Sequence, residues 1–189
     1  MKKNLSFGIK AALLLLIGIS ALTGCERMEQ QAGILSTPSA KQAIATISPV
    51  GENSATGMAV FTQDSDQITL TIEVQNVSPG IHGVHIHEYG DCSSPDGKSA
   101  GGHWNPTDVE HGKWGEGEFH LGDIGNITVG EDGTGSIELT TDLWEIDTGS
   151  DIDVVGKSII LHADADDFVS QPSGNAGARI GCGVIVLAE

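Results

Sequence analysis

Basic side chains are scarce in this chain of 189 residues. It has 9 Lys and Arg against 26 Asp and Glu, so its formal net charge is −17 at pH 7. Phosphate backbones and anionic headgroups repel so acidic a protein. We therefore expect no nucleic acid partner and no electrostatic attachment to a membrane.

Aromatic residues and helical periodicity are lacking as well. Phe, Trp and Tyr make up 4% of the chain, so Val, Ile and Leu must build most of the core. No segment of useful length has a helical period, and there is no internal repeat or second domain. With 26 Gly and 6 Pro, the composition favours a turn-rich, all-β domain with short appendages.

The first 24 residues form a separate segment. Lys2 and Lys3 precede a short apolar stretch, residues 11–19, which is too short for a membrane span. This pattern predicts a secretory signal. Its end, Leu-Thr-Gly-Cys, resembles the bacterial lipobox, in which the cysteine (here Cys25) becomes the lipidated first residue of the mature protein. Acyl chains on Cys25 would hold the protein to a bacterial membrane, facing the periplasm or the cell exterior, without spanning it. An ordinary signal peptide and an uncleaved anchor are the alternatives.

Removal of this signal would change the charge and the cysteine count. The whole chain has a charge of −17. The signal contains three lysines and no acidic residue, so its removal would bring the charge of the mature protein to about −20. Of the three cysteines, Cys25 would carry lipid, and Cys92 and Cys182 would remain. Export permits a disulfide between them. It would close a long loop and stabilise the fold by about 3–5 kcal/mol in the chain-entropy model.

Alternating apolar residues predict eight strands after a flexible tether over residues 25–40. In residues 67–75, for example, Ile68, Leu70, Ile72 and Val74 point to one face. The predicted strands cover residues 41–48, 54–63, 67–75, 81–87, 124–129, 135–140, 157–162 and 184–188. Residues 88–122 remain as an unusually long loop, which needs a special reason.

The reason for the long loop is a set of metal-ligating residues, which comprises six of the seven histidines and one carboxylate. The set is His85, His87, His103, His111, His120, Asp123 and His162. On a strand, residues at positions i and i+2 share a face, so the first two imidazoles can grip one ion. Each motif alone also fits ordinary core or surface histidines, but together they exceed what one tetrahedral ion can use. Imidazole suits copper and zinc, and a carboxylate among imidazoles fits zinc. The set therefore predicts a two-metal centre, with His82 left over as a structural residue.

Five segments carry a family resemblance: HGVHIHEYGD, GGHWNP, HLGDIGN, HADADD and GNAGARIGCGVI. They resemble the hallmark segments of copper/zinc superoxide dismutases, and the similarity runs from about residue 41 to residue 189. The lipobox and a shortened loop before Arg179 are similar to the bacterial exported branch. The resemblance implies an all-β, eight-stranded Greek-key barrel or sandwich of immunoglobulin-like architecture with long metal-binding loops.

The resemblance also implies a role for each site residue. Copper would be bound by His85, His87, His103 and His162. Zinc would be bound by His103, which bridges the two metals, and by His111, His120 and Asp123. Asp166 would link the rings of His85 and His111, Arg179 would lie beside the copper channel as a catalytic residue with His103, and Cys92 and Cys182 would form the disulfide.

The implied reaction converts two superoxide anions and two protons to O₂ and H₂O₂ while copper cycles between Cu(II) and Cu(I). This reaction would serve antioxidant defence outside the cytoplasm. The protein would act as a monomer or a homodimer. The alternative is a catalytically silent copper-binding protein of the same fold, but such a protein typically lacks a copper ligand or the arginine. A copper chaperone would favour thiolates or Met-rich segments, and the chain has three Met and no C-x-x-C motif.

One segment departs from the family pattern. Residues 163–178 contain three Asp and no Lys or Arg, although this loop helps to steer superoxide in many relatives. We therefore expect a rate below that of the fastest members and an attenuated dependence on salt.

Overall fold

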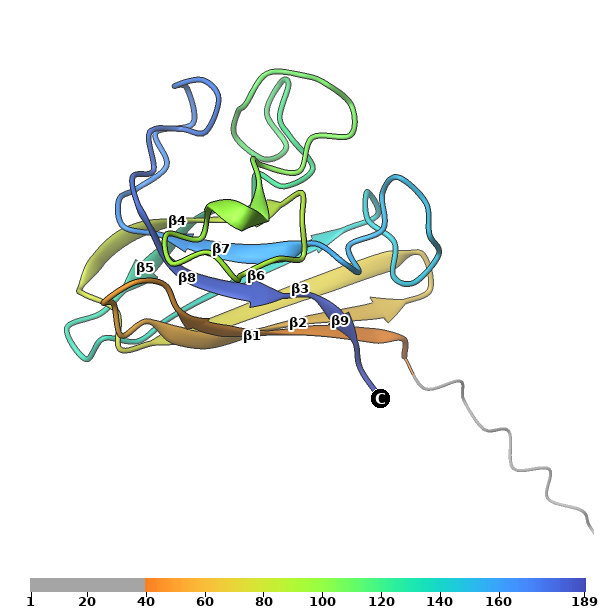
Figure 1. The fold of residues 1–189 in the computed structure, drawn as a ribbon. Helices are drawn as coiled ribbons and strands as arrows, with labels where there is room; N and C mark the ends of the chain where they lie inside the picture. Colours follow the sequence, from red (N-terminus) through yellow and green to blue (C-terminus); the bar gives the residue numbers. More distant parts are fainter. Residues whose placement is uncertain (1–39) are drawn as a thin grey trace, which may run out of the picture. The chain divides into compact units, whose positions relative to one another are not determined.

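The computed structural model describes residues 40–189, which form an all-β barrel (Figure 1). The strands are β1 (Gln42–Pro49), β2 (Thr56–Asp64), β3 (Gln67–Gln75), β4 (Gly80–His87), β5 (Gly125–Val129), β6 (Gly135–Thr141), β7 (Ser158–His162), β8 (Arg179–Val184) and β9 (Val186–Leu187). β9 continues β8 after a break at Ile185, where the backbone bonds instead to Gly156 and Lys157. Eight strands therefore build the barrel.

All neighbouring strands are antiparallel, in the order β2-β3-β6-β5-β4-β7-β8-β1. β1 closes the barrel because it pairs with β2 on one side and with β8 and β9 on the other. The chain crosses over between β3 and β4 and again between β6 and β7, which gives Greek-key connections. This confirms the predicted fold class.

Alternation along the strands builds the core from aliphatic side chains. In β1, Ala43, Ala45 and Ile47 are buried, while the intervening residues face outward. All five residues of β7 are buried. Trp144 packs edge-on against Phe61 at a centroid distance of 5.8 Å, which uses two of the few aromatic residues.

Seven of the eight predicted strands lie within two residues of their observed bounds, but the prediction for the last strand was wrong. It begins at Arg179 rather than at residue 184. The prediction placed residues 179–183 in the preceding loop, whereas Gly181 and Gly183 let β8 approach β1 closely. A Cβ atom at Gly181 would lie 2.9 Å from Ile47 Cγ2, and one at Gly183 would lie 2.7 Å from the carbonyl oxygen of Thr46.

Two long loops, residues 88–124 and 163–178, rise on the same side of the barrel near β4 and β7 (Figure 1). The predicted disulfide between Cys92 and Cys182 is confirmed, and it ties the first loop to β8. Within residues 40–189 the one helical segment is a 3₁₀ turn, Lys98–Ala100, and no helix there has the length and hydropathy to cross a membrane. The predictions for Cys25 and the signal segment lie outside the described residues.

Candidate metal centre

The seven predicted ligands form two groups of four that share one residue. The first is His85, His87, His103 and His162, and the second is His103, His111, His120 and Asp123. Within each group the possible ligand atoms lie within 4.8 Å of one another. Every member is buried, with an exposed fraction of at most 8%. His103 is the shared residue, and its ring centroid lies 4.0 Å from that of His85.

The barrel strands position the first group. His85 and His87 lie on one face of β4, and β4 pairs with β7, which ends at His162. The long loop brings in the fourth residue: His103 forms an isolated bridge with His87, and the Trp104 amide donates to the Ile86 carbonyl at 2.9 Å. Three imidazoles therefore stand on rigid strands, and one is added by a loop hydrogen-bonded to the same strand.

Backbone carbonyls fix the orientation of three rings. The contacts are His87 Nδ1 to Gly101 O (3.0 Å), His162 Nδ1 to Gly177 O (3.4 Å) and His120 Nε2 to Val109 O (3.1 Å). A carbonyl oxygen only accepts, so each of these nitrogens donates. In the neutral ring the opposite nitrogen then carries a lone pair directed into the site, as expected of a metal ligand.

Asp166 fixes two further rings, as the resemblance implied. Its Oδ2 accepts from His85 Nε2 at 2.8 Å and its Oδ1 from His111 Nε2 at 3.0 Å. One carboxylate thereby joins a ring of the first group to a ring of the second. His103 is the one ligand histidine that offers both of its nitrogens to the site.

The arrangement of lone pairs fits bound cations. The Nε2 atoms of His87 and His162 face each other at 3.4 Å, although both carry lone pairs in the neutral rings. His111 Nδ1 and His120 Nδ1 lie 3.0 and 3.1 Å from the carboxylate of Asp123. Like-charged electron pairs at these distances repel unless a positive charge lies among them. Two buried nitrogens, His85 Nδ1 and His103 Nε2, have no hydrogen-bond partner, which is unusual for buried polar atoms.

In the metal-free protein, protons respond to the same environment. Burial alone would raise the pKa of Asp123, but hydrogen bonds from His103, His111 and His120 hold it far below its usual value. Burial lowers the pKa of His111, but the hydrogen bonds to Asp123 and Asp166 outweigh this effect and raise the pKa to about 9. Burial and the neighbouring His85 lower the pKa of His103 to about 4. The second group therefore attracts positive charge, whereas the first keeps its rings neutral.

The site opens into a cleft of about 510 Å³ lined in part by His87, His103, His120, His162, Gln171 and Arg179. Arg179 donates to the carbonyls of Gly97 at 2.7 Å and Gly101 at 2.6 Å. It forms no ion pair with any carboxylate in residues 40–189. The other cations of this region are engaged: Lys41, Lys98 and Lys113 pair with acidic residues, and Lys157 lies over Trp104. Arg179 therefore presents an unneutralised positive charge at the cleft.

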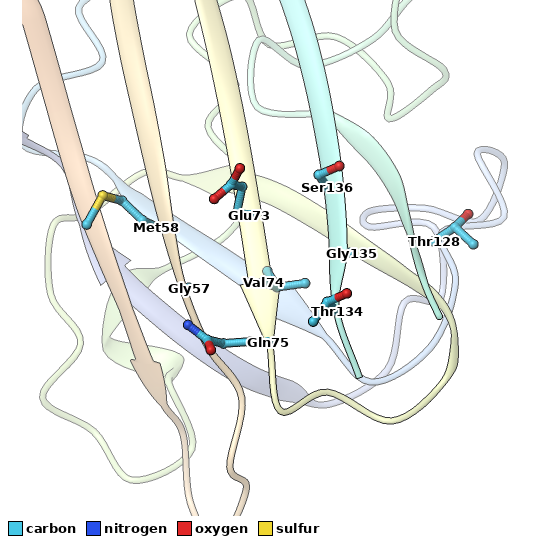
Figure 2. Close-up of a pocket in the computed structure, with 9 residues that line it drawn as sticks. All are labelled: Gly57, Met58, Glu73, Val74, Gln75, Thr128, Thr134, Gly135 and Ser136. Atoms are coloured by element: carbon cyan, nitrogen blue, oxygen red, sulfur yellow. The ribbon is translucent and has the colours of Figure 1, made fainter. Parts of the chain in front are cut away.

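His82 lies outside both groups. Its ring nitrogens are each 2.9 Å from a carbonyl oxygen, that of His162 and that of Ser78, which fits its predicted structural role. A wider groove of about 810 Å³ crosses β2, β3 and β6 (Figure 2). Its lining contains one carboxylate, Glu73, and no imidazole or thiol, so it offers no comparable set of ligands.

Some supporting residues were not predicted from the sequence. The side-chain amides of Asn105, Asn126 and Gln171 each pair with both the N–H and the C=O of one residue near the site: Val109, Asp166 and His111, respectively. In the sequence these residues are ordinary polar residues in or near loops. Their partners are 4, 40 and 60 positions away, and no spacing rule connects them.

The stability of the metal-free protein should be highest near neutral pH. The pKa values of His85, His87, His103 and His162 are lowered, first of all by burial. The unfolded chain therefore binds more protons below pH 6.5, and stability falls as the pH drops from about 6.5 toward 4. For His111, whose pKa is raised to about 9, the contribution is complete below about 6.5 and is lost as the pH rises through 9. Urea unfolding of the metal-free protein across this range tests the expectation, and a midpoint that increased steadily toward pH 4 would contradict it.

Comparison with known proteins agrees with this geometry. Residues 55–185 match the family model described as copper/zinc superoxide dismutase (SODC). Among solved structures, the crystal structure of the clock protein EA4 is 32% identical, with a TM-score of 0.69 over 79% of this chain and 96% of that one. The family match spans well over half of the chain, so this protein belongs to the copper/zinc superoxide dismutase family.

Proposed function

We propose that the protein is an active superoxide dismutase, which converts two superoxide anions and two protons to O₂ and H₂O₂. The family also includes inactive members, so membership alone does not decide the matter. The supporting observation is completeness: both groups of four ligands are assembled, they share His103, and the cleft beside them holds Arg179. A catalytically silent copper-binding protein has no need for all of these features together.

The two groups suit different metals. His85, His87, His103 and His162 would hold copper, because four imidazoles suit that ion. His103, His111, His120 and Asp123 would hold zinc, for which three imidazoles and a carboxylate form a fitting tetrahedral set. When bound, copper supplies one-electron transfer by alternating between Cu(II) and Cu(I), and zinc supplies a fixed positive charge without redox chemistry.

His103 is the residue of this chain best suited to move a proton. Its Nδ1 lies 2.8 Å from Asp123 Oδ1, while its Nε2 faces the first group and has no protein partner. A proton carried on Nε2 would lie beside the cleft, where reduced oxygen must be protonated.

Arg179 is suited to attract the substrate. Its two hydrogen bonds to carbonyls fix the guanidinium at the cleft without neutralising its charge. Superoxide is a small anion, and a fixed cation at the entrance raises its local concentration. The neighbouring loop, residues 163–178, brings no further cation.

Metal content and activity should depend on the same residues. We expect one copper and one zinc per chain and superoxide removal by the loaded protein, measured on one sample. His103→Ala and His162→Ala should each abolish activity. His103→Ala removes the imidazole that both groups share, and His162→Ala removes an imidazole of the first group. Binding of both metals without superoxide removal would favour the silent alternative, and full activity without copper would end the proposal.

Replacement of Arg179 should slow the reaction without removing metal. Arg179→Ala should lower kcat/KM by about tenfold, the lower end of what electrostatic attraction contributes. Lys113→Ala is the matched control, because Lys113 is exposed and paired with Glu116, and it should keep nearly full activity. The wild-type rate should depend only weakly on salt. A near-diffusion-limited rate that collapses with added salt would contradict this account.

We also propose that the protein is exported and lipid-anchored through Cys25. The support comes from the sequence, in which a short apolar stretch leads to Leu22-Thr23-Gly24-Cys25. The acidic domain gives no reason for electrostatic membrane binding, so acyl chains would have to hold it there. An extracytoplasmic position would expose it to superoxide from outside, which crosses membranes poorly as an anion.

Detergent phase partitioning of the protein from its native host tests the anchor. The wild type should enter the detergent phase, and Cys25→Ser should remain in the aqueous phase because it lacks the acyl chains. Equal partitioning of the two forms into the aqueous phase would show that Cys25 carries no lipid.

A further inference from the structure

The segment that carries His111 is held by side chains rather than by backbone pairing. Residues 109–112 belong to no strand or helix. Their backbone groups bond to four side chains: Val109 to Asn105 and His120, His111 to Gln171, and Gly112 to Asp123. Within residues 40–189, no backbone–backbone hydrogen bond reaches His111. Its position therefore depends on the side chain that replaces such pairing.

Gln171 is that side chain. Its Oε1 accepts from the His111 N–H at 2.9 Å, and its Nε2 donates to the His111 carbonyl at 2.9 Å. The amide thus forms a closed pair with one residue, much as a neighbouring strand does. Asn126 holds Asp166 in the same way, at 2.8 and 2.9 Å. Asp166 in turn accepts from the His111 ring.

His111 is therefore fixed at two points by the loop of residues 163–178. Asp166 holds the ring at Nε2, and Gln171 holds the backbone. One contact alone would let the residue pivot about it, whereas two together direct Nδ1 toward Asp123. The other ligands of the second group need no such help from this loop. His120 and Asp123 form a local turn, in which the Asp123 amide donates to the His120 carbonyl at 3.0 Å, and His103 lies beside β4.

We propose that Gln171 is a positioning residue for the zinc site: its amide sets the backbone of His111 so that Nδ1 reaches the ion. The inference rests on the proposed assignment of the second group to zinc. It gives the short acidic loop a task besides bordering the cleft, because the loop supplies both contacts that hold one zinc ligand. Copper binding depends on this clamp far less, since three of the four copper ligands stand on β4 and β7.

Zinc affinity of the full-length, metal-free protein tests the proposal, measured by competition with a chromogenic chelator. Gln171→Leu removes both hydrogen bonds at similar size and should weaken Zn²⁺ binding about tenfold, the lower end of the effect of losing a partner that orients a ligand. Cu²⁺ affinity should change by less than about twofold on the same scale. The matched control is Gln63→Leu, an exposed amide on β2 that bonds only to the Ser65 carbonyl, and it should leave both affinities unchanged. Zn²⁺ affinity unchanged in Gln171→Leu, or an equal loss for both metals, would overturn the proposal.

A second variant separates geometry from charge. Gln171→Glu keeps an acceptor for the His111 N–H but places an oxygen against the His111 carbonyl. The added negative charge alone would tighten Zn²⁺ binding, whereas loss of the clamp weakens it. Weaker binding therefore supports the positioning role, and equal or tighter binding refutes it. If the wild type does not bind one Zn²⁺ per chain, the proposed function is contradicted. If the wild type binds Zn²⁺ normally and Gln171→Leu binds it equally well, only the positioning role of Gln171 is contradicted.

Discussion

Lone pairs of buried imidazoles face one another and a buried carboxylate in this protein, and a positive charge among them is needed to hold them there. The hydrogen bonds on the outer side of the rings create this situation. Each carbonyl or carboxylate that accepts a hydrogen bond from one ring nitrogen directs the lone pair of the other nitrogen inward. The site is therefore preorganised for cations and is under electrostatic stress without them. The buried nitrogens of His85 and His103 that lack a hydrogen-bond partner are the clearest sign of that stress.

The two ligand groups differ in how the chain supports them. β4 and β7 carry three imidazoles of the first group, so the barrel sets the backbone positions of these residues. The second group stands on the long loop, whose order comes from side-chain amides, the Asp123 turn and the disulfide. A bound ion can supply folding free energy to such a loop. This difference in support suits a redox-active ion in the rigid, strand-based group and a structural ion in the loop-based group.

The sequence allowed prediction of the parts that depend on local pattern or on residue type. Alternation located seven strands, and the rarity of histidine elsewhere singled out the ligand set. Prediction failed where a distant neighbour decides the role of a residue. The start of β8 was missed because the sequence does not show that Gly181 and Gly183 lie against β1. Gln171 gave no signal because its partner His111 is 60 positions away. Nor does the sequence show that Arg179 bonds to two backbone carbonyls instead of a carboxylate.

The acidic surface and an anionic substrate are compatible because screening limits the range of the surface charges. At physiological ionic strength the Debye length is about 8 Å, so exposed carboxylates farther from the cleft than this act weakly on an approaching anion. Arg179 at the cleft and the charge of metal ions bound in the proposed site beneath it would act at short range, in partly buried surroundings where screening is smaller. The balance between the two fields thus shifts toward attraction as the anion enters the cleft. Added salt weakens both the distant repulsion and the local attraction, and this opposition is the physical reason to expect a shallow salt dependence.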